Sequence, residues 1–436
     1  RNYFFSLKDF KKRFFFRLYS KETTGRERFP LSFAQQRLWF FEKLNPNTLA
    51  YNMSGLFKVN ARIDERVLRQ SLDYIVKRHE VLRTVFKEDE NGIYQSVLST
   101  IDYYFSQKDL SDIDSAERQK IISDLSWKEA NNKFDLEKGP LFRVTWIKEP
   151  SSISTLLMSM HHIISDGWSV EVLLYELKKV YSSFLRGEKP SLSQLPIQYG
   201  DFAAWQRERM QGDLKDKQLK FWIDELKGVP EILHLPTDRK RPSVQTFKGD
   251  TVELTLEGKL REDIQALSNS LGATTFMVLL ASYQILLSKY SGQNDFCVGI
   301  PIAGRSNSQV QDLIGFFINA LVIRGKPEVD IRAADFIGSV KETALNVFNN
   351  QDLPAETLLD ALNIKRSLSY EPLAQVGFTL QNYPERNSAA DEIEITLLKE
   401  EHVTAKYDLT LYAFEVEESI NLVAEYNTDL FDRETI

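Results

Sequence analysis

The chain has 436 residues, of which 42% are hydrophobic and 27% are charged, and its formal net charge is −7 at pH 7. This is longer than a chain that usually folds around one hydrophobic core, so we predict two lobes of ordinary domain size. The acidic balance argues against nucleic acid as the main partner, and the sequence shows neither an apolar run that could span a bilayer nor a secretory signal peptide. We therefore expect a cytoplasmic protein that binds neither nucleic acid nor a membrane.

Cys297 is the one cysteine of the chain, so an intrachain disulfide bond is excluded. The absence of a disulfide framework is consistent with a reducing compartment. Cys297 lies in the apolar run Phe296–Ile300, which is typical of a buried strand. We expect a buried, unreactive thiol there rather than a nucleophile.

Residues 1–28 differ in composition from the rest of the chain. Aromatic clusters at residues 3–5 and 14–16 are interleaved with lysines and arginines. A basic, aromatic helix of this kind could lie on a membrane surface or dock a partner chain. Its apolar residues do not form one clean stripe, which favours a linker or an appended helix that covers the main body. We predict an N-terminal linker or docking segment over residues 1–28.

Residues 29–186 alternate helical and strand-like patterns, which predicts an α/β lobe. Asp64 is a good N-cap for the amphipathic pattern that follows it. The predicted elements are helices over 32–44, 65–78, 116–131 and 170–185 and strands over 51–59, 93–98, 103–105, 141–147 and 153–160.

A pair of histidines, His161 and His162, stands at the end of the last of these strands, although the chain has only five histidines. Ser165 and Asp166 follow as good N-caps, so the histidines lie in a strand-to-helix turn, where α/β folds place reactive groups. Imidazole has an ordinary pKa of about 6.5, which suits general-base chemistry. Adjacent residues that leave a strand point in opposite directions, so only one histidine can easily face a cleft. The alternative is that both are satisfied core or capping residues.

Residues 187–436 repeat the alternation of helices and strands after a linker rich in glycine and proline. We therefore expect a second lobe, and residues 432–436 read as the start of a further helix before which the chain stops. The predicted elements are helices over 199–210, 215–226, 260–268, 275–290 and 333–349 and strands over 296–302, 318–323, 376–381, 393–398, 409–415 and 420–426.

The segment His161-His162-Ile163-Ile164-Ser165-Asp166-Gly167 resembles the active-site motif of the condensation domains of nonribosomal peptide synthetases, relatives of chloramphenicol acetyltransferase. Five further segments resemble motifs of this family in the same order, at residues 31–39, 78–86, 199–205, 314–319 and 350–354. As a set these motifs are highly specific. Two positions depart from the family, Ala355 in the sixth motif and Tyr370 in the seventh, and they bear on subtype and substrate more than on chemistry.

The resemblance implies an α/β fold of two chloramphenicol-acetyltransferase-like lobes, residues 29–186 and 187–436, arranged as a V-shaped pseudo-dimer. It implies condensation of a donor acyl or peptidyl thioester on one peptidyl carrier protein with the amine of an aminoacyl thioester on another. No cofactor is expected to be bound covalently, because partner carrier proteins present the 4'-phosphopantetheine arm. An adjacent adenylation domain and a monomeric state within a larger synthetase are also implied.

The same resemblance assigns roles to the residues of the turn. His162 is the expected general base or stabiliser of the tetrahedral intermediate, and the sequence leaves both roles open, while His161 is expected to be structural. Asp166 is expected to brace the turn in an ion pair, and Gly167 to leave room for the pantetheine arm. Arg305 is the first choice as partner of Asp166, with Arg78 and Arg83 as the runners-up. The residues expected to line the substrate channel are Trp168, Ser169 and Asn319.

Competing interpretations remain. A metal site is disfavoured, because adjacent histidines lack the i, i+4 spacing of a zinc helix and there is no cysteine pair. Cyclising relatives carry aspartates in place of both histidines, and epimerase relatives share the His-His core but differ around Gly167 and over residues 78–86. Two interpretations stay open: a starter-type domain that N-acylates the first amino acid with a fatty acyl group, and a non-catalytic platform that docks carriers.

Overall fold

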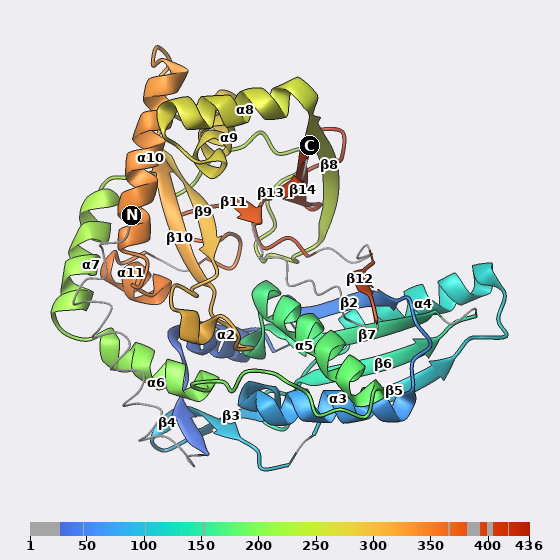
Figure 1. Ribbon diagram of the computed structural model, residues 1–436. Coiled ribbons are helices and arrows are strands. Elements are labelled where there is room, and N and C mark those ends of the chain that lie inside the picture. The colour runs from blue at the N-terminus through green and yellow to red at the C-terminus, as the bar shows by residue number, and fades with distance from the viewer. Residues whose placement is uncertain are drawn as a thin grey trace. The chain divides into compact units, whose positions relative to one another are not determined.

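A computed structural model describes residues 27–46, 48–100, 102–150, 153–364, 367–381, 393–398, 404–416 and 418–436 (Figure 1). The predicted N-terminal linker therefore lies outside the described residues except for Glu27 and Arg28.

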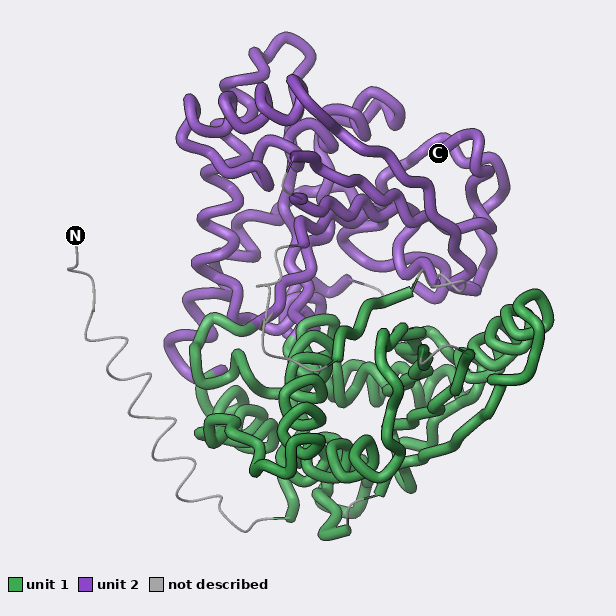
Figure 2. The backbone as a smooth tube through the Cα atoms, turned by 45° about the vertical axis from the view of Figure 1, so that its right-hand side comes forward, with its two compact units in different colours: residues 1–209, 305–317, 384–401 green, residues 210–304, 318–383, 402–436 purple. Residues whose placement is uncertain are grey.

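Two compact units divide the chain, and Figure 2 colours them separately. Unit 1 consists of residues 1–209, 305–317 and 384–401, and unit 2 of residues 210–304, 318–383 and 402–436. The units therefore do not divide at the predicted boundary after Arg186. Helix α6 (Tyr199–Arg209) packs on the first strand of unit 1, and residues 305–317 are tied to Asp166, so both belong to unit 1. The predicted V-shaped arrangement of the lobes stays a prediction.

Unit 1 contains a five-stranded sheet of order β12-β2-β7-β6-β5 and a three-stranded sheet of order β1-β4-β3. In the large sheet only β5 and β6 run parallel. The elements of unit 1 are β1 (Arg28–Pro30), α2 (Phe33–Leu44), β2 (Asn52–Val59), α3 (Glu65–Arg78), β3 (Thr84–Asp89), β4 (Gly92–Val97), β5 (Tyr104–Asp109), α4 (Ser115–Ala130), β6 (Phe142–Lys148), β7 (Ser154–His161), α5 (Gly167–Leu185), α6 and β12 (Ile395–Leu397), with 3-10 turns η1 (Glu80–Arg83), η2 (His162–Ile164) and η3 (Ser308–Val310).

Strand β7 is the centre of the large sheet, and every one of its residues is buried. Such a strand must be covered on both faces. Helix α4 supplies one cover, because its Ile122 packs with Leu56 of β2 and Leu157 of β7. Helices α3 and α5 pack on each other on the side of the sheet turned toward the viewer in Figure 1. The strand that carries His161 is thus held rigidly from both sides.

Side chains cap the first two helices of unit 1, and Asp64 is the N-cap that the sequence predicts. Ser32 and Gln35 form a capping box at the start of α2, and Asp64 accepts a hydrogen bond from Val67 N at the start of α3. Each of these bonds satisfies a backbone N–H that has no partner inside the helix. The predicted start of α3 at residue 65 is correct.

Unit 2 contains a six-stranded sheet of order β10-β9-β11-β13-β14-β8. Within the described residues no single helix is long and apolar enough to cross a membrane, although α8 and α9, bent by 105°, have the length and composition to do so together. The elements of unit 2 are α7 (Asp213–Glu225), β8 (Gly249–Glu257), α8 (Gly258–Leu271), α9 (Thr275–Ser291), β9 (Phe296–Ile302), β10 (Asn319–Gly325), α10 (Ala333–Asn349), α11 (Ala355–Ala361), β11 (Val376–Gln381), β13 (Leu409–Val416) and β14 (Ser419–Asn427).

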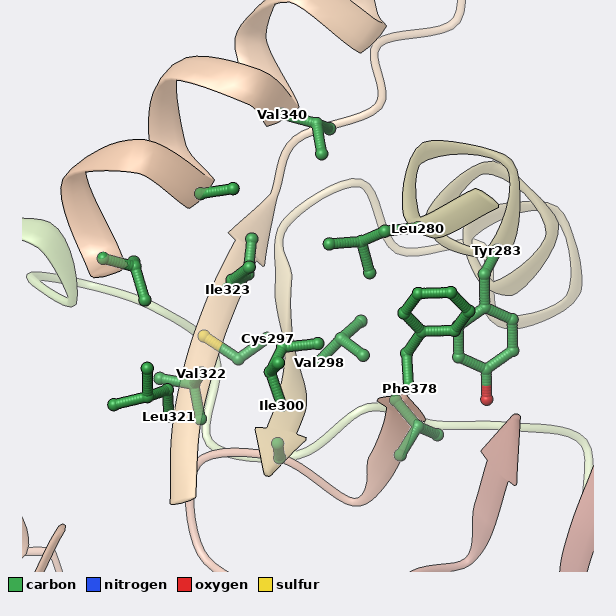
Figure 3. Close-up of a cluster of buried hydrophobic side chains, with 14 of the residues drawn as sticks. Leu280, Tyr283, Cys297, Val298, Ile300, Leu321, Val322, Ile323, Val340 and Phe378 are labelled. Atoms are coloured by element: carbon green, nitrogen blue, oxygen red, sulfur yellow. The ribbon is translucent and has the colours of Figure 1, made fainter. Parts of the chain in front are cut away.

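The core of unit 2 lies between this sheet and helices α9 and α10, as Figure 3 shows around Cys297. Cys297 is 2% exposed among apolar side chains of β9, β10 and α9. Burial raises the pKa of its thiol to about 12, because a thiolate would lose its hydration there. The predicted burial of this thiol is confirmed, and its low reactivity stays a prediction.

Four elements are absent from the sequence prediction: β1, β3, β8 and α11. β8 is an edge strand with an alternating pattern, Val252, Leu254 and Leu256, but most of its residues are only partly covered. Residues 433–435 form a turn, and the backbone N–H of Ile436 donates to the carbonyl of Asp432 at 3.3 Å, so the predicted start of a further helix stays a prediction.

We predict opposite effects of alanine at two glycines of unit 2. A Cβ atom at Gly325 would lie 2.5 Å from the side chain of Gln284, which is fully buried, whereas a Cβ atom at Gly338, inside α10, meets nothing within 4 Å. Gly325→Ala should lower the free energy of unfolding by about 1–3 kcal/mol through overpacking. Gly338→Ala should raise it by about 0.5–1 kcal/mol through helix propensity. Urea denaturation of both variants checks the signs, and equal effects would contradict this packing.

Candidate functional site

The histidine pair lies where strand β7 passes into helix α5. β7 ends at His161, the single turn η2 follows, and Asp166 is the N-cap of α5. The backbone N–H of His162 donates to the carbonyl of Tyr51 at 2.8 Å, and that of His161 donates to Leu141 at 3.1 Å. Main-chain hydrogen bonds to the residues that directly precede β2 and β6 therefore hold the turn independently of its side chains.

The hydrogen bond at Nδ1 of His162 determines the tautomer of its imidazole. Nδ1 lies 2.7 Å from the carbonyl oxygen of Ser165, and a carbonyl oxygen can only accept a hydrogen bond. Nδ1 therefore carries the proton, and in the neutral ring the lone pair is on Nε2. His162 is 9% exposed. This is the form that a general base requires.

Aromatic rings flank the imidazole of His162. The ring of Phe316 lies 4.8 Å from it and the ring of Tyr51 lies 6.3 Å from it, centroid to centroid, both in edge-to-face geometry. Phe41 of α2 contacts Tyr51 in the same way at 5.3 Å. These contacts restrict the rotation of the imidazole and surround it with apolar surface.

His161 has the opposite tautomer. Its Nδ1 accepts a hydrogen bond of 3.1 Å from the N–H of Ile163, so Nδ1 carries no proton in this geometry. Its Nε2 lies 3.3 Å from a carboxylate oxygen of Glu42 on α2, to which it can donate. His161 is 2% exposed, and the ring of Phe134 lies 6.0 Å from it. Every one of these contacts ties His161 to the fold.

The carboxylate of Asp166 is surrounded by hydrogen-bond donors. One oxygen lies 2.8 Å from the backbone nitrogen of Ser169, 2.6 Å from its hydroxyl and 3.0 Å from the guanidinium of Arg305. The other accepts from the N–H of Phe317 at 3.0 Å. The side chains of Asp166 and Arg305 are each 1% exposed. This is a buried ion pair with hydrogen bonds to both carboxylate oxygens.

Arg305 also folds the loop that carries it. It donates to the carbonyls of Val310 at 2.7 Å and Leu313 at 2.6 Å, and its guanidinium lies 4.1 Å from the ring centre of Phe317. The indole N–H of Trp168 donates to the carbonyl of Gln311 at 2.8 Å. Residues 305–317, which we call the clamp segment, are thereby fastened to the start of α5.

The other predicted ion-pair residues lie elsewhere. Arg78 pairs with Glu176 at 2.9 Å, and Arg83 donates to the carbonyl of Leu98 and pairs with Glu80, so neither contacts Asp166. The reason is local: both arginines lie at the C-terminal end of α3 and in η1, where a carboxylate or carbonyl is nearer.

The predicted channel residues differ in their contacts. Ser169 is fully buried, and its hydroxyl contacts Asp166, Arg305 and Gly315, so its expected place in a channel is corrected to a place in the ion-pair network. Asn319 belongs to unit 2 and donates to the carbonyls of Gln351 and Leu353 at 2.8 and 3.0 Å.

Tyr199 is a site residue whose role the sequence did not reveal. Its hydroxyl lies 2.5 Å from the carbonyl of Phe316 and 2.9 Å from the hydroxyl of Ser32. Burial raises the pKa of this phenol above its ordinary value. A Cβ atom at Gly315 would lie 2.0 Å from the Tyr199 ring, so only glycine fits there. The sequence marks Tyr199 only as the first residue of a segment that resembles a family motif, and this resemblance does not indicate what its side chain contacts.

The site combines one imidazole, which can take part in acid–base chemistry, with the apolar rings that flank it. Within the described parts of the chain, no group of three histidine, cysteine, aspartate or glutamate side chains could hold a metal ion. One imidazole of defined tautomer, held beside Phe316 and braced by a buried ion pair, can accept or share a single proton.

Comparison with known proteins gives the family. A family model described as "Condensation domain" matches residues 26–436. The chain is 45% identical over 410 residues to one of the linear gramicidin synthase proteins of Brevibacillus parabrevis, a match that covers 93% of this chain and 8% of that protein. It is 38% identical over 412 residues to surfactin synthase subunit 1 of Bacillus subtilis (strain 168), which covers 94% of this chain and 11% of that protein. The chain thus spans about a tenth of the length of these relatives.

A solved structure supports the fold. The X-domain from teicoplanin biosynthesis superposes with a TM-score of 0.82 at 23% identity, over 94% of this chain and 92% of that one. The expected chloramphenicol-acetyltransferase-like α/β fold is therefore confirmed. The match of the family model over residues 26–436 and the 45% identity to a linear gramicidin synthase protein, which agree with the His-His-x-x-x-Asp-Gly turn, show that the chain belongs to the condensation-domain family of nonribosomal peptide synthetases, which form amide bonds by acyl transfer.

Proposed function

We propose that the chain joins an aminoacyl or peptidyl thioester of L-type, carried by a donor protein, to the amine of an aminoacyl thioester on an acceptor carrier protein. His162 is the residue that handles the proton. One observation carries this assignment: the 2.7 Å contact of its Nδ1 with the Ser165 carbonyl, which puts the lone pair on Nε2. The starter-type alternative is not favoured by the relatives, which belong to peptide synthases.

The reaction moves one proton. The acceptor nitrogen attacks the thioester carbonyl carbon, a C–N bond forms, and the carbonyl oxygen gains negative charge. The nitrogen then gives a proton to Nε2 of His162, the C–S bond breaks, and the thiolate takes the proton back as a thiol. A thioester is already activated and an α-amino group has a pKa near 8, so alignment and this single transfer are the main demands.

Asp166 is a positioning residue in this proposal. Its carboxylate accepts hydrogen bonds from the backbone of Ser169 and of Phe317 and from Arg305. Both carboxylate oxygens are therefore already bonded to donors of the protein. Asp166 therefore holds the turn and the clamp segment and takes no proton from substrate. His161 acts in the same structural sense through Ile163 and Glu42.

Further roles are extensions of the same proposal. Gly167 begins α5 directly after the turn and is proposed to leave room for the phosphopantetheine arm of a carrier. Trp168, half-buried and tied to Gln311, and Asn319 are proposed to border the path of the substrates. The partners are donor and acceptor carrier proteins and an adjacent adenylation domain, in a synthetase within which the domain is monomeric.

We predict that His162→Ala lowers the single-turnover rate of amide formation by about a hundredfold to ten-thousandfold, the usual loss of a general base. The measurement uses carrier-bound donor and acceptor and mass detection of the product. His234→Ala is the matched control, because His234 is an exposed histidine of unit 2. A near wild-type rate for His162→Ala with an unchanged melting temperature would remove His162 from the mechanism.

Asp166→Ala should destabilise unit 1 by roughly 3–5 kcal/mol, because Arg305 would stay buried without its carboxylate. Glu188→Ala, which removes an exposed ion pair with Arg186, should cost less than about 0.5 kcal/mol. Urea denaturation compares the two. An unchanged stability together with lost activity would instead give Asp166 a direct chemical role.

A matrix of donors tests the substrate class. Wild-type protein should form product with aminoacyl and peptidyl carrier donors of L configuration and much less with fatty acyl donors. Efficient turnover with acyl-coenzyme A or fatty acyl carriers, and none with aminoacyl carriers, would establish the starter-type alternative. No turnover with any donor, while carriers still bind, would establish the non-catalytic platform.

A further inference from the structure

A third buried histidine, His79, lies close to the site and has no role in the mechanism above. It follows the last residue of α3 and is 1% exposed. Its Nε2 lies 2.9 Å from a carboxylate oxygen of Glu176 on α5, and its Nδ1 lies 3.3 Å from the backbone nitrogen of Ile314 in the clamp segment. His79 therefore bridges α5 and the clamp segment.

The two contacts determine the protonation of His79. The N–H of Ile314 can only donate, so Nδ1 must carry a lone pair. Nε2 then carries the proton and donates to Glu176, which is 2% exposed. The second oxygen of Glu176 accepts from Arg78 at 2.9 Å, so the buried carboxylate has a cationic partner that does not depend on His79. The contribution that only His79 makes is therefore its Nδ1 atom, which accepts the hydrogen bond of the Ile314 N–H.

Ile314 begins a run of four residues in the clamp segment, each of which has at least one backbone atom bonded to a buried side chain from another element. Phe316 lies within this run, and its ring contacts the imidazole of His162 at 4.8 Å. The pairs are Ile314 N with His79, Gly315 N with Ser169, Phe316 O with Tyr199 and Phe317 N with Asp166.

We propose that His79 is a positioning residue for the reaction: by accepting the hydrogen bond of Ile314 it sets the ring of Phe316 against the imidazole of His162. This inference rests on the proposed role of His162. Without the bond at Ile314, the backbone N–H of Ile314 loses its acceptor between the anchors at Leu313 and Gly315, and the Phe316 ring gains freedom to tilt away. A displacement of about 1 Å at a reacting group can cost up to about a hundredfold in rate.

Two substitutions separate the two bonds of His79. The amide of asparagine reaches the place of Nδ1 and can still accept from Ile314, whereas the amide of glutamine reaches the place of Nε2 and can still donate to Glu176. His79→Gln should lower kcat by about 10- to 100-fold without raising KM for either carrier, because His79 touches no substrate. His79→Asn should restore most of kcat. The reverse order would overturn the proposal and make His79 a partner of Glu176 only.

Nuclear magnetic resonance of the imidazoles gives a readout that does not depend on turnover. The chain has only five histidines, so single substitutions assign their signals. The ring current of Phe316 should shift the His162 signals in wild-type protein and in His79→Asn, and this shift should shrink in His79→Gln. Equal shifts in all three proteins would overturn the proposal.

The wild-type spectrum tests the proposal even if both variants unfold. Its ¹⁵N shifts must show His79 with Nε2 protonated and Nδ1 accepting, and the opposite tautomer would overturn it. Because this arm needs no substrate, its failure differs from failure of the proposed function, which would appear as full activity of His162→Ala.

Discussion

The buried pair of Asp166 and Arg305 is the interaction on which the site depends. Two charges with 1% exposure are tolerable only if hydrogen bonds satisfy them, and here one carboxylate oxygen accepts from Ser169 and Arg305 and the other from the backbone N–H of Phe317. Because Asp166 is also the N-cap of α5, the same carboxylate fixes where that helix begins. The turn with His162, the helix and the clamp segment therefore share one anchor, and the geometry of His162 follows from it.

The adjacent histidines have opposite tautomers although they are neighbours in the sequence. His161 receives a backbone N–H at Nδ1, whereas the same atom of His162 faces a carbonyl oxygen. The backbone of the turn alone thus makes the two rings opposite tautomers. His161 turns its proton toward Glu42 inside the protein, while His162 keeps a lone pair on Nε2. Neither composition nor spacing distinguishes the two; the turn geometry does.

The sequence predicts what local patterns determine. Local sequence determines α3 and β7: the first through the N-cap Asp64 and an apolar periodicity, the second through a continuous apolar run. Both elements therefore lie within one or two residues of their predicted bounds. Strand β8 was missed because an edge strand needs little burial to form. The choice of Arg305 as partner of Asp166 came from a family resemblance, and the structure places the pair at 3.0 Å.

Side-chain contacts between segments that are distant in the sequence cannot be predicted from local patterns. No local sequence pattern marks Ser169 as a member of the ion-pair network, because it follows the only partly buried Trp168 within the same motif. Tyr199 and Gly315 are complementary only because one ring occupies the space that a side chain would need. Such pairs depend on tertiary packing, which periodicity and capping rules do not contain.

The discontinuity of unit 1 has a consequence for synthesis on the ribosome. Asp166 and Arg305 are separated by 139 residues, and β12 joins the sheet of unit 1 only after most of unit 2 has been made. Until residue 317 leaves the exit tunnel, Asp166 cannot pair with Arg305, and the clamp segment cannot pack against the start of α5. Unit 1 therefore completes its fold late, after long-range loop closure, and the histidine turn acquires its final geometry only once the segment made last among its partners has docked.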